Sequence, residues 1–135
     1  VKQFPQHIFI FLTKCPQNLI KWSPFPENCW VGISATNQAQ SDAALQYLPN
    51  IKAKVKFFSY EPLLEHINFF YRGAFLKNGK PYVKWLIIGY QTQPVRHTKR
   101  GWLEEILLAA DKAGIPVFAK EPLASYYNIQ RKELP

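Results

Sequence analysis

Five short apolar runs, separated by more polar stretches, restrict the folds open to this chain of 135 residues. The runs are residues 8–12, 29–33, 55–59, 85–89 and 116–119. Most are continuously apolar and rich in β-branched or aromatic residues, which is typical of strands covered on both faces, as in parallel sheets. The run at 55–59 alternates more and follows Lys52 and Lys54, so we expect it nearer an edge, where lysines discourage aggregation.

The clearest helical pattern lies between the last two runs. Apolar side chains recur on one face of residues 102–113. Glu104 and Glu105 are expected in the first turn, where carboxylates complement the helix dipole. Gly114 is expected to end the helix as a left-handed cap.

Two further helices are expected earlier in the chain. One covers residues 38–48, with Thr36 or Asn37 as its N-cap. A shorter one lies near residues 16–22, with a proline at its favoured first position.

Strands that alternate with helices indicate an α/β fold with a parallel sheet of about five strands and right-handed crossovers. The chain length fits a single domain over residues 1–135. The pattern leaves two architectures open, a doubly wound sheet or a partial (β/α) barrel. Segment 65–82 departs from the strand–helix rhythm, and its Asn78-Gly79 pair predicts a hairpin-like insertion.

The chain is strongly basic, with 17 lysines and arginines against 9 acidic residues and a net charge of +8. A positive field of this size attracts polyanions, among which nucleic acid is the first candidate partner. The same side chains would also keep an aromatic-rich surface in solution, so that charge alone leaves both interpretations open.

Cysteine usage and hydropathy exclude several classes of protein. Cys15 and Cys29 are too few for a disulfide framework, which favours a reducing, cytoplasmic location. Neither they nor the 3 histidines have the spacing of a zinc site, so no structural metal is expected. No apolar stretch approaches the roughly 18–20 residues of a membrane helix. The chain contains no methionine and starts at Val1, which predicts a processed or trimmed polypeptide.

Polar side chains follow each predicted strand at its carboxyl end, where parallel α/β proteins place their functional residues. If the topology holds, five of these side chains meet on one rim as ligand-binding candidates. They are Lys14, Ser34, Glu61, Gln91 and Lys120. The alternative is that polar residues at strand exits are ordinary and bind nothing.

Individual chemical roles at this rim are less specific. Lys14 could lower the pKa of the Cys15 thiol and make it a nucleophile, although a lone cysteine is more often a packing residue. Glu61 or Glu121 could act as a general acid or base, or could form a structural ion pair. Gly89 stands alone in its segment, so no glycine-rich phosphate loop is present.

A basic cluster stands directly before the helix expected at 102–113. It contains Arg96, His97, Lys99 and Arg100. Cations near a helix N-terminus oppose its dipole, so a bound anion would explain their position. A solvated basic loop is the alternative.

Five segments, in this order, carry a resemblance to a known family. They are 11–19 (FLTKCPQNL), 30–34 (WVGIS), 57–64 (FFSYEPLL), 85–89 (WLIIG) and 113–120 (AGIPVFAK). They resemble the motifs LTKRPENL, WLGVS, RFLSCEPLL, WVIVGG and AGVPFFFK of the phage-associated gp-thirty-seven/gp-sixty-eight-like proteins. That family is of unknown function and is related to radical S-adenosylmethionine (radical SAM) enzymes.

The resemblance implies a partial (β/α) barrel of which this chain supplies the later strands. An earlier strand of the family carries a three-cysteine loop for an iron–sulfur cluster, and two cysteines cannot replace it. We therefore expect no cofactor in this chain, and an iron–sulfur cluster with S-adenosylmethionine only in a longer protein. An open half-barrel exposes apolar strand surface, so the expected partners are an N-terminal half or a second copy.

The chain departs from the family's motifs at several rim positions. Cys15 replaces an arginine, Thr36 replaces an acidic residue, and residues 89–93 lack the second glycine and the glutamate of GGESG. Glu61 and Lys120 are retained. Two functions follow as expectations: the C-terminal part of a radical-SAM-related protein that is not catalytic alone, or a non-enzymatic module that binds nucleic acid through Arg96 to Arg100.

Overall fold

A computed structural model describes residues 1–69 and 75–135 of the chain. Its main sheet contains five parallel strands, all of which coincide with the predicted apolar runs. The strands are β1 (Phe9–Thr13), β2 (Cys29–Ser34), β3 (Val55–Tyr60), β6 (Trp85–Ile88) and β9 (Val117–Ala119). Helices α1 (Gln38–Tyr47), α2 (Arg100–Ala113) and α3 (Leu123–Tyr127) and the 3-10 helices η1 (Pro16–Trp22) and η2 (Leu48–Asn50) lie between or after them. The α/β class and the five-stranded parallel sheet are thus confirmed.

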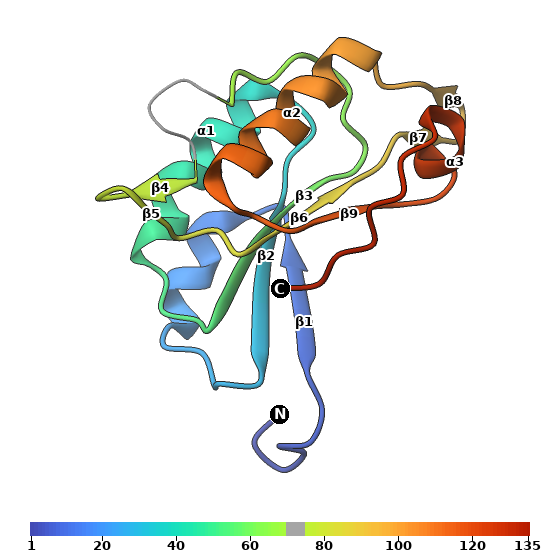
Figure 1. Cartoon of the computed structure of the whole chain (residues 1–135). Helices are drawn as coiled ribbons and strands as arrows, with labels where there is room; N and C mark the ends of the chain where they lie inside the picture. Colours follow the sequence, from blue (N-terminus) through green and yellow to red (C-terminus); the bar gives the residue numbers. More distant parts are fainter. Residues whose placement is uncertain (70–74) are drawn as a thin grey trace.

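The strands lie side by side in the same order as in the chain, β1-β2-β3-β6-β9. A doubly wound sheet would reverse this order and carry helices on both faces. Here α1 and α2 lie on the same side of the sheet (Figure 1). They bury side chains such as Ala44 and Ile106 against Val31, Phe58 and Leu86 of the strands. The opposite face of the sheet carries no helix among the described residues.

The structure corrects the interpretation of two apolar runs. The run at 55–59 forms β3, the central strand, whose side chains are mostly buried between β2 and β6. Lys56, within β3, is half-buried, and its ammonium group donates to the carbonyl of Leu48, the C-cap residue of α1, at 2.9 Å. The first apolar run forms β1, an edge strand on which Ile10 and Leu12 are 54% and 51% exposed. Its continuous hydrophobicity therefore does not reflect cover on both faces by the described residues.

The caps of the helices follow the sequence in most respects. The Asn37 side chain accepts from the Gln40 N–H at 2.9 Å and so caps α1, and Gly114 ends α2 with a left-handed φ of 65°. The prediction that Glu104 and Glu105 occupy the first turn of α2 was wrong, because α2 begins at Arg100.

Two short antiparallel pairs interrupt the strand–helix rhythm. β4 (Leu76–Lys77) pairs with β5 (Lys80–Pro81) around Asn78 and Gly79, whose φ values of 53° and 71° suit a type I′ turn. Residues 70–74 of the predicted insertion lie outside the described part of the chain. β7 (Gln91–Thr92) pairs with β8 (Val95–Arg96) beyond the carboxyl end of β6.

The C-terminal residues 131–133 lie along the outer edge of β9. The Ala119 N–H donates to the Arg131 carbonyl at 2.9 Å, and the Glu133 N–H donates to the Val117 carbonyl at 3.0 Å. The Glu133 carboxylate accepts from the Val117 N–H at 2.7 Å, and its own carbonyl accepts from the Trp85 indole at 2.9 Å. The tail therefore pairs the backbone groups that β9 would otherwise expose to solvent.

This tail should detach in acid. The Arg131 guanidinium, 2.9 Å from Glu133, and the Val117 N–H hold the pKa of the Glu133 carboxyl below its ordinary value. A depressed folded-state pKa means that the stabilisation is complete above about pH 4.5, and is lost as the pH falls through the folded pKa. We expect the Trp85 indole N–H resonance in ¹H–¹⁵N spectra to shift over that acid range.

The Glu133→Gln variant controls for general acid unfolding. It should show the shifted Trp85 resonance already at pH 7 and lose the titration. A Trp85 resonance that titrates equally in both proteins would show that Glu133 does not hold the tail.

Candidate functional site

The carboxyl ends of β3 and β9 bring two predicted rim residues into contact. Glu61 follows β3 and Lys120 follows β9, and the carboxylate lies 2.7 Å from the ammonium nitrogen. Strand β6 separates these two strands in the sheet, so the ion pair spans a whole strand. The side chains of Lys120 and Glu61 remain 45% and 32% exposed. An ion pair this accessible contributes little to stability and can exchange its partner for a ligand.

Gly89, at the end of β6, makes this ion pair sterically feasible. A Cβ atom at residue 89 would lie 2.9 Å from Cγ of Glu61. The Gly89 N–H donates to the Tyr60 carbonyl at 3.1 Å, and the Leu63 N–H donates to the Gly89 carbonyl at 2.9 Å. These bonds fix the glycine directly below the Glu61 side chain. From the sequence we concluded only that Gly89 is not part of a glycine-rich phosphate loop. Its contact with Glu61 could not be predicted, because Glu61 follows the neighbouring strand β3.

The other predicted rim residues do not join this contact. Ser34 is buried at the end of β2, level with Ser59 of β3 in the strand register. Ser59 was missed by the sequence analysis, although a polar residue inside an apolar strand was a usable signal. The Gln91 side chain donates to the Pro94 carbonyl at 2.9 Å and so braces the β7–β8 turn. Lys14 is exposed just after β1, at the far edge of the sheet.

Glu121, the alternative general acid or base, is bound by Ser125 and Lys132. Its carboxylate accepts from the Ser125 hydroxyl at 2.6 Å and the Ser125 N–H at 3.1 Å, and it lies 3.2 Å from Lys132. These hydrogen bonds to Ser125, with the Lys132 ammonium, keep the pKa of Glu121 below its ordinary value. The carboxylate is thus held ionised at the start of α3.

The helix-free face of the sheet forms an aromatic floor below the rim. Its rings are those of Trp30, Phe57, Trp85 and Phe118, one from each of four adjacent strands. Their centroids are 5.8 Å apart for Trp30–Trp85, 5.4 Å for Phe57–Trp85 and 6.2 Å for Trp85–Phe118. Spacings and tilts of this kind are favourable for aromatic pairs. The floor resembles the layered interior of a (β/α) barrel, in which side chains from successive strands stack below a polar mouth.

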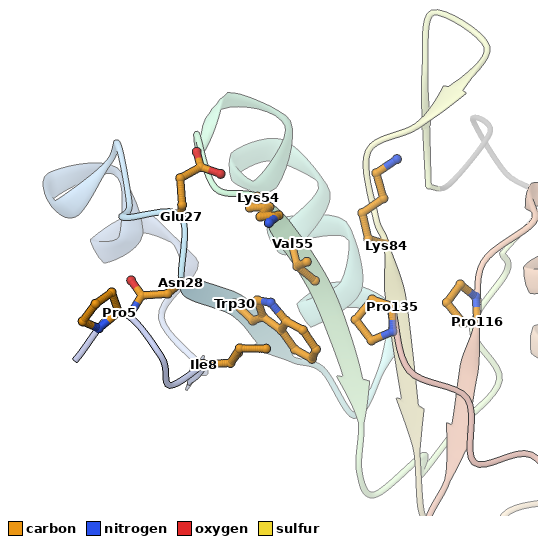
Figure 2. Close-up of a pocket in the computed structure, with 10 residues that line it drawn as sticks. All are labelled: Pro5, Ile8, Glu27, Asn28, Trp30, Lys54, Val55, Lys84, Pro116 and Pro135. Atoms are coloured by element: carbon orange, nitrogen blue, oxygen red, sulfur yellow. The ribbon is translucent and has the colours of Figure 1, made fainter. Parts of the chain in front are cut away.

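A hollow of about 670 Å³ opens at the opposite, amino-terminal end of the strands. Figure 2 shows Trp30 and Val55 within it and Lys54 and Lys84 along its border. Pro135, at the end of the tail, also lines it. The amino-terminal ends of parallel strands usually serve stability rather than chemistry. We therefore place the candidate site at the rim and not in this hollow.

The predicted anion-binding cluster divides between β8 and α2. Arg96 ends β8 and His97 follows it. Lys99 occupies the N-cap position of α2 without a capping hydrogen bond from its side chain, and Arg100 is the first residue of the helix. Lys99 lies over the Trp102 ring at 5.1 Å, and Arg100 lies over the Tyr127 ring at 5.3 Å. The cations of the cluster therefore contact aromatic rings, one of which, Tyr127, lies 27 positions after Arg100 in the sequence.

Cys15 and Cys29 do not share a site. Cys15 is exposed beyond the end of β1, whereas Cys29 is buried at the start of β2 beside Phe9. No group of three or more His, Cys, Asp or Glu side chains that could hold a metal ion occurs in the part of the chain that the structure describes. Within the same part, no helix has both the length and the apolarity needed to cross a membrane.

Comparison with known proteins adds a family assignment. No curated protein and no solved structure matches the chain. One family model matches residues 1–130, which is nearly the whole sequence and includes the strands, the rim and the basic cluster. The chain therefore belongs to the family described as "Protein of unknown function (DUF5131)".

Proposed function

We propose that this chain supplies the later strands of a partial (β/α) barrel related to the radical SAM enzymes, and that its rim binds a zwitterionic ligand. The observation that carries this proposal is the Glu61–Lys120 ion pair, which stands over Gly89 at the carboxyl ends of the strands. The consecutive strand order and the aromatic floor on the helix-free face support the barrel.

The chemistry of the pair selects the ligand class. A molecule that carries both an ammonium and a carboxylate can bind Glu61 through the first and Lys120 through the second. Hydrogen bonds between charged groups contribute about 1.5–3 kcal/mol each, which exceeds the contribution of a half-exposed ion pair. The methionine part of S-adenosylmethionine carries both groups, so the pair fits this end of the cofactor.

The iron–sulfur cluster does not fit this chain. It requires three cysteines, and the sequence contains only Cys15 and Cys29, which lie at opposite ends of β1 and β2. We therefore assign no chemical step to the chain itself. Earlier strands that carry three closely spaced cysteines would have to come from a preceding segment of a longer protein or from a separate polypeptide. The reading frame upstream of Val1 tests the first of these sources directly.

Calorimetric titration of S-adenosylmethionine into the longer protein tests the rim. We expect the Glu61→Gln variant to bind roughly 10- to 100-fold more weakly, because it removes one charged hydrogen bond. Gly89→Ala should weaken binding as well, since its new methyl group displaces Glu61.

The matched control is Glu105→Gln. Glu105, on α2, forms a partly exposed 2.7 Å pair with His66 and is not one of the rim residues, so its loss should leave the affinity unchanged. Failure of the longer protein to bind S-adenosylmethionine, or equal affinity in the Glu61 and Glu105 variants, would remove the proposal.

A further inference from the structure

His97 and Tyr126 form a ring stack on the surface beside α3. Their centroids are 4.1 Å apart and their planes differ by 15°. Tyr90 meets the edge of His97 at 4.7 Å, and Tyr127 meets the edge of Tyr126 at 4.8 Å. Tyr126 is 58% exposed, and His97 is exposed too. Exposed apolar side chains that cluster, unlike single ones, often mark an interaction surface.

The residues next to the stack, which joins α3 to the loop after β8, are held by hydrogen bonds. The Thr98 hydroxyl is fully buried and donates to the Leu63 carbonyl at 2.9 Å. The Tyr127 hydroxyl donates to the Thr98 carbonyl from the opposite side. Figure 1 shows β7, β8 and α3 close together at one end of the sheet, in agreement with the ring contacts between them. The position of His97 is thus fixed before any ligand arrives.

Three cations belong to the segment that carries His97. Arg96 and Lys99 flank His97 in the chain, and Arg100 lies over Tyr127. Glu104 lies 3.8 Å from Arg100, but both side chains are largely exposed, so Glu104 offsets little of the positive charge of Arg100. The other carboxylates nearby, Glu61 and Glu121, are already bound to Lys120 and Lys132. The surface around the stack is therefore net positive.

We propose that the His97–Tyr126 stack is a platform for the bases of single-stranded nucleic acid, whose phosphates are bound by Arg96, Lys99 and Arg100. Aromatic rings can stack on any base, and cations beside the rings bind the phosphates of the nucleic-acid backbone. A duplex keeps its base faces covered, so only unpaired bases can reach the rings. This platform needs neither additional strands nor a cofactor, and so it is independent of the rim proposal.

The rim lies close enough for the two sites to serve one ligand. Tyr90 contacts His97 and follows Gly89 directly, and Gly89 supports Glu61. A strand bound on the platform would pass along the same carboxyl-terminal end of the sheet.

Fluorescence anisotropy with labelled 12-mers of dT and rU tests the platform in this chain. Tyr126→Ala should weaken binding roughly tenfold, because each base–aromatic stack is lost with the ring, while Tyr126→Phe should stay within about twofold. With three phosphate contacts, the plot of log affinity against log salt should have a slope of about −2, and Arg96→Ala should reduce its magnitude by about 0.7.

Trp22→Ala and Lys21→Ala are the matched controls, since they alter an exposed aromatic–cation pair on η1. They should bind as tightly as the unaltered chain. Similar affinity for dT and rU would indicate recognition of base faces alone, and preference for rU would add contacts to the 2′-hydroxyl; both support the platform. Binding that is absent, equally weakened by the control variants, or tighter for duplex DNA than for either single strand would overturn it.

Discussion

Replacing Gly32 with alanine should destabilise the chain by about 3 kcal/mol, which is at the upper end of the cost of overpacking a core. A Cβ atom at residue 32 would lie 2.2–2.6 Å from three ring atoms of Phe57. Phe57 is fully buried and packs against Trp85, so its ring cannot move aside without disturbing the aromatic floor. Chemical denaturation with urea, followed by circular dichroism, measures the difference.

Two further variants separate this clash from a general intolerance of substitution. Gly101→Ala adds the same methyl group on α2, where nothing lies within 4 Å of the new atom, and should stabilise the chain by about 0.5–1 kcal/mol. Adding Phe57→Leu to Gly32→Ala should recover part of the loss, because the smaller side chain leaves room for the methyl group. If Gly32→Ala is as stable as the unaltered chain, the proposed contact between Gly32 and the Phe57 ring is wrong.

The isolated chain is expected to self-associate through β1. This strand pairs with β2 on one side only among the described residues, and it exposes Ile10, Phe11 and Leu12. A long apolar edge of this kind invites pairing with another chain. Sedimentation velocity across a concentration series should show species larger than 15.7 kDa.

The Ile10→Lys, Leu12→Lys double variant should sediment as a monomer, because charges on an edge strand oppose pairing. Leu108→Lys is the control, since Leu108 is similarly exposed at 49% but lies on α2, away from the edge. A monomeric unaltered chain at all concentrations, or equal dissociation by the control, would contradict assembly through β1.

Much of the fold could be predicted because its signals are local. Short apolar runs marked all five strands. Asn37 marked the start of α1 through its side chain, and Gly114 marked the end of α2 through its left-handed backbone. The position of a strand within the sheet is not local. Lys52 and Lys54 before β3 suggested an edge, but β3 lies at the centre of the sheet between β2 and β6, because strand pairing across the folded chain sets its position.

The candidate site, like the fold, could be predicted only where its signals are local. Glu61 and Lys120 were predicted from their positions after strands, and the structure brings them to 2.7 Å. Gln91 satisfied the same positional rule, yet the adjacent cis Gln93-Pro94 turn occupies its amide. The stack of His97 on Tyr126 could not be foreseen, because it joins a residue of the connection between β6 and β9 to a residue of α3, which follows β9. Positional rules therefore identify candidates, and local hydrogen bonding decides which of them face the ligand.

The tail along β9 determines how the sheet can grow. A closed ring of strands requires the last strand to pair with the first, but the outward N–H and carbonyl groups of Val117 and Ala119 already bond to the tail. Strands supplied from elsewhere can therefore join only beside β1, and the assembly would remain an arc with a gap next to β9. Tyr126 follows β9 on α3 and so stands at that gap. A polymer too long to thread a closed ring would reach the rim through this gap, from the side.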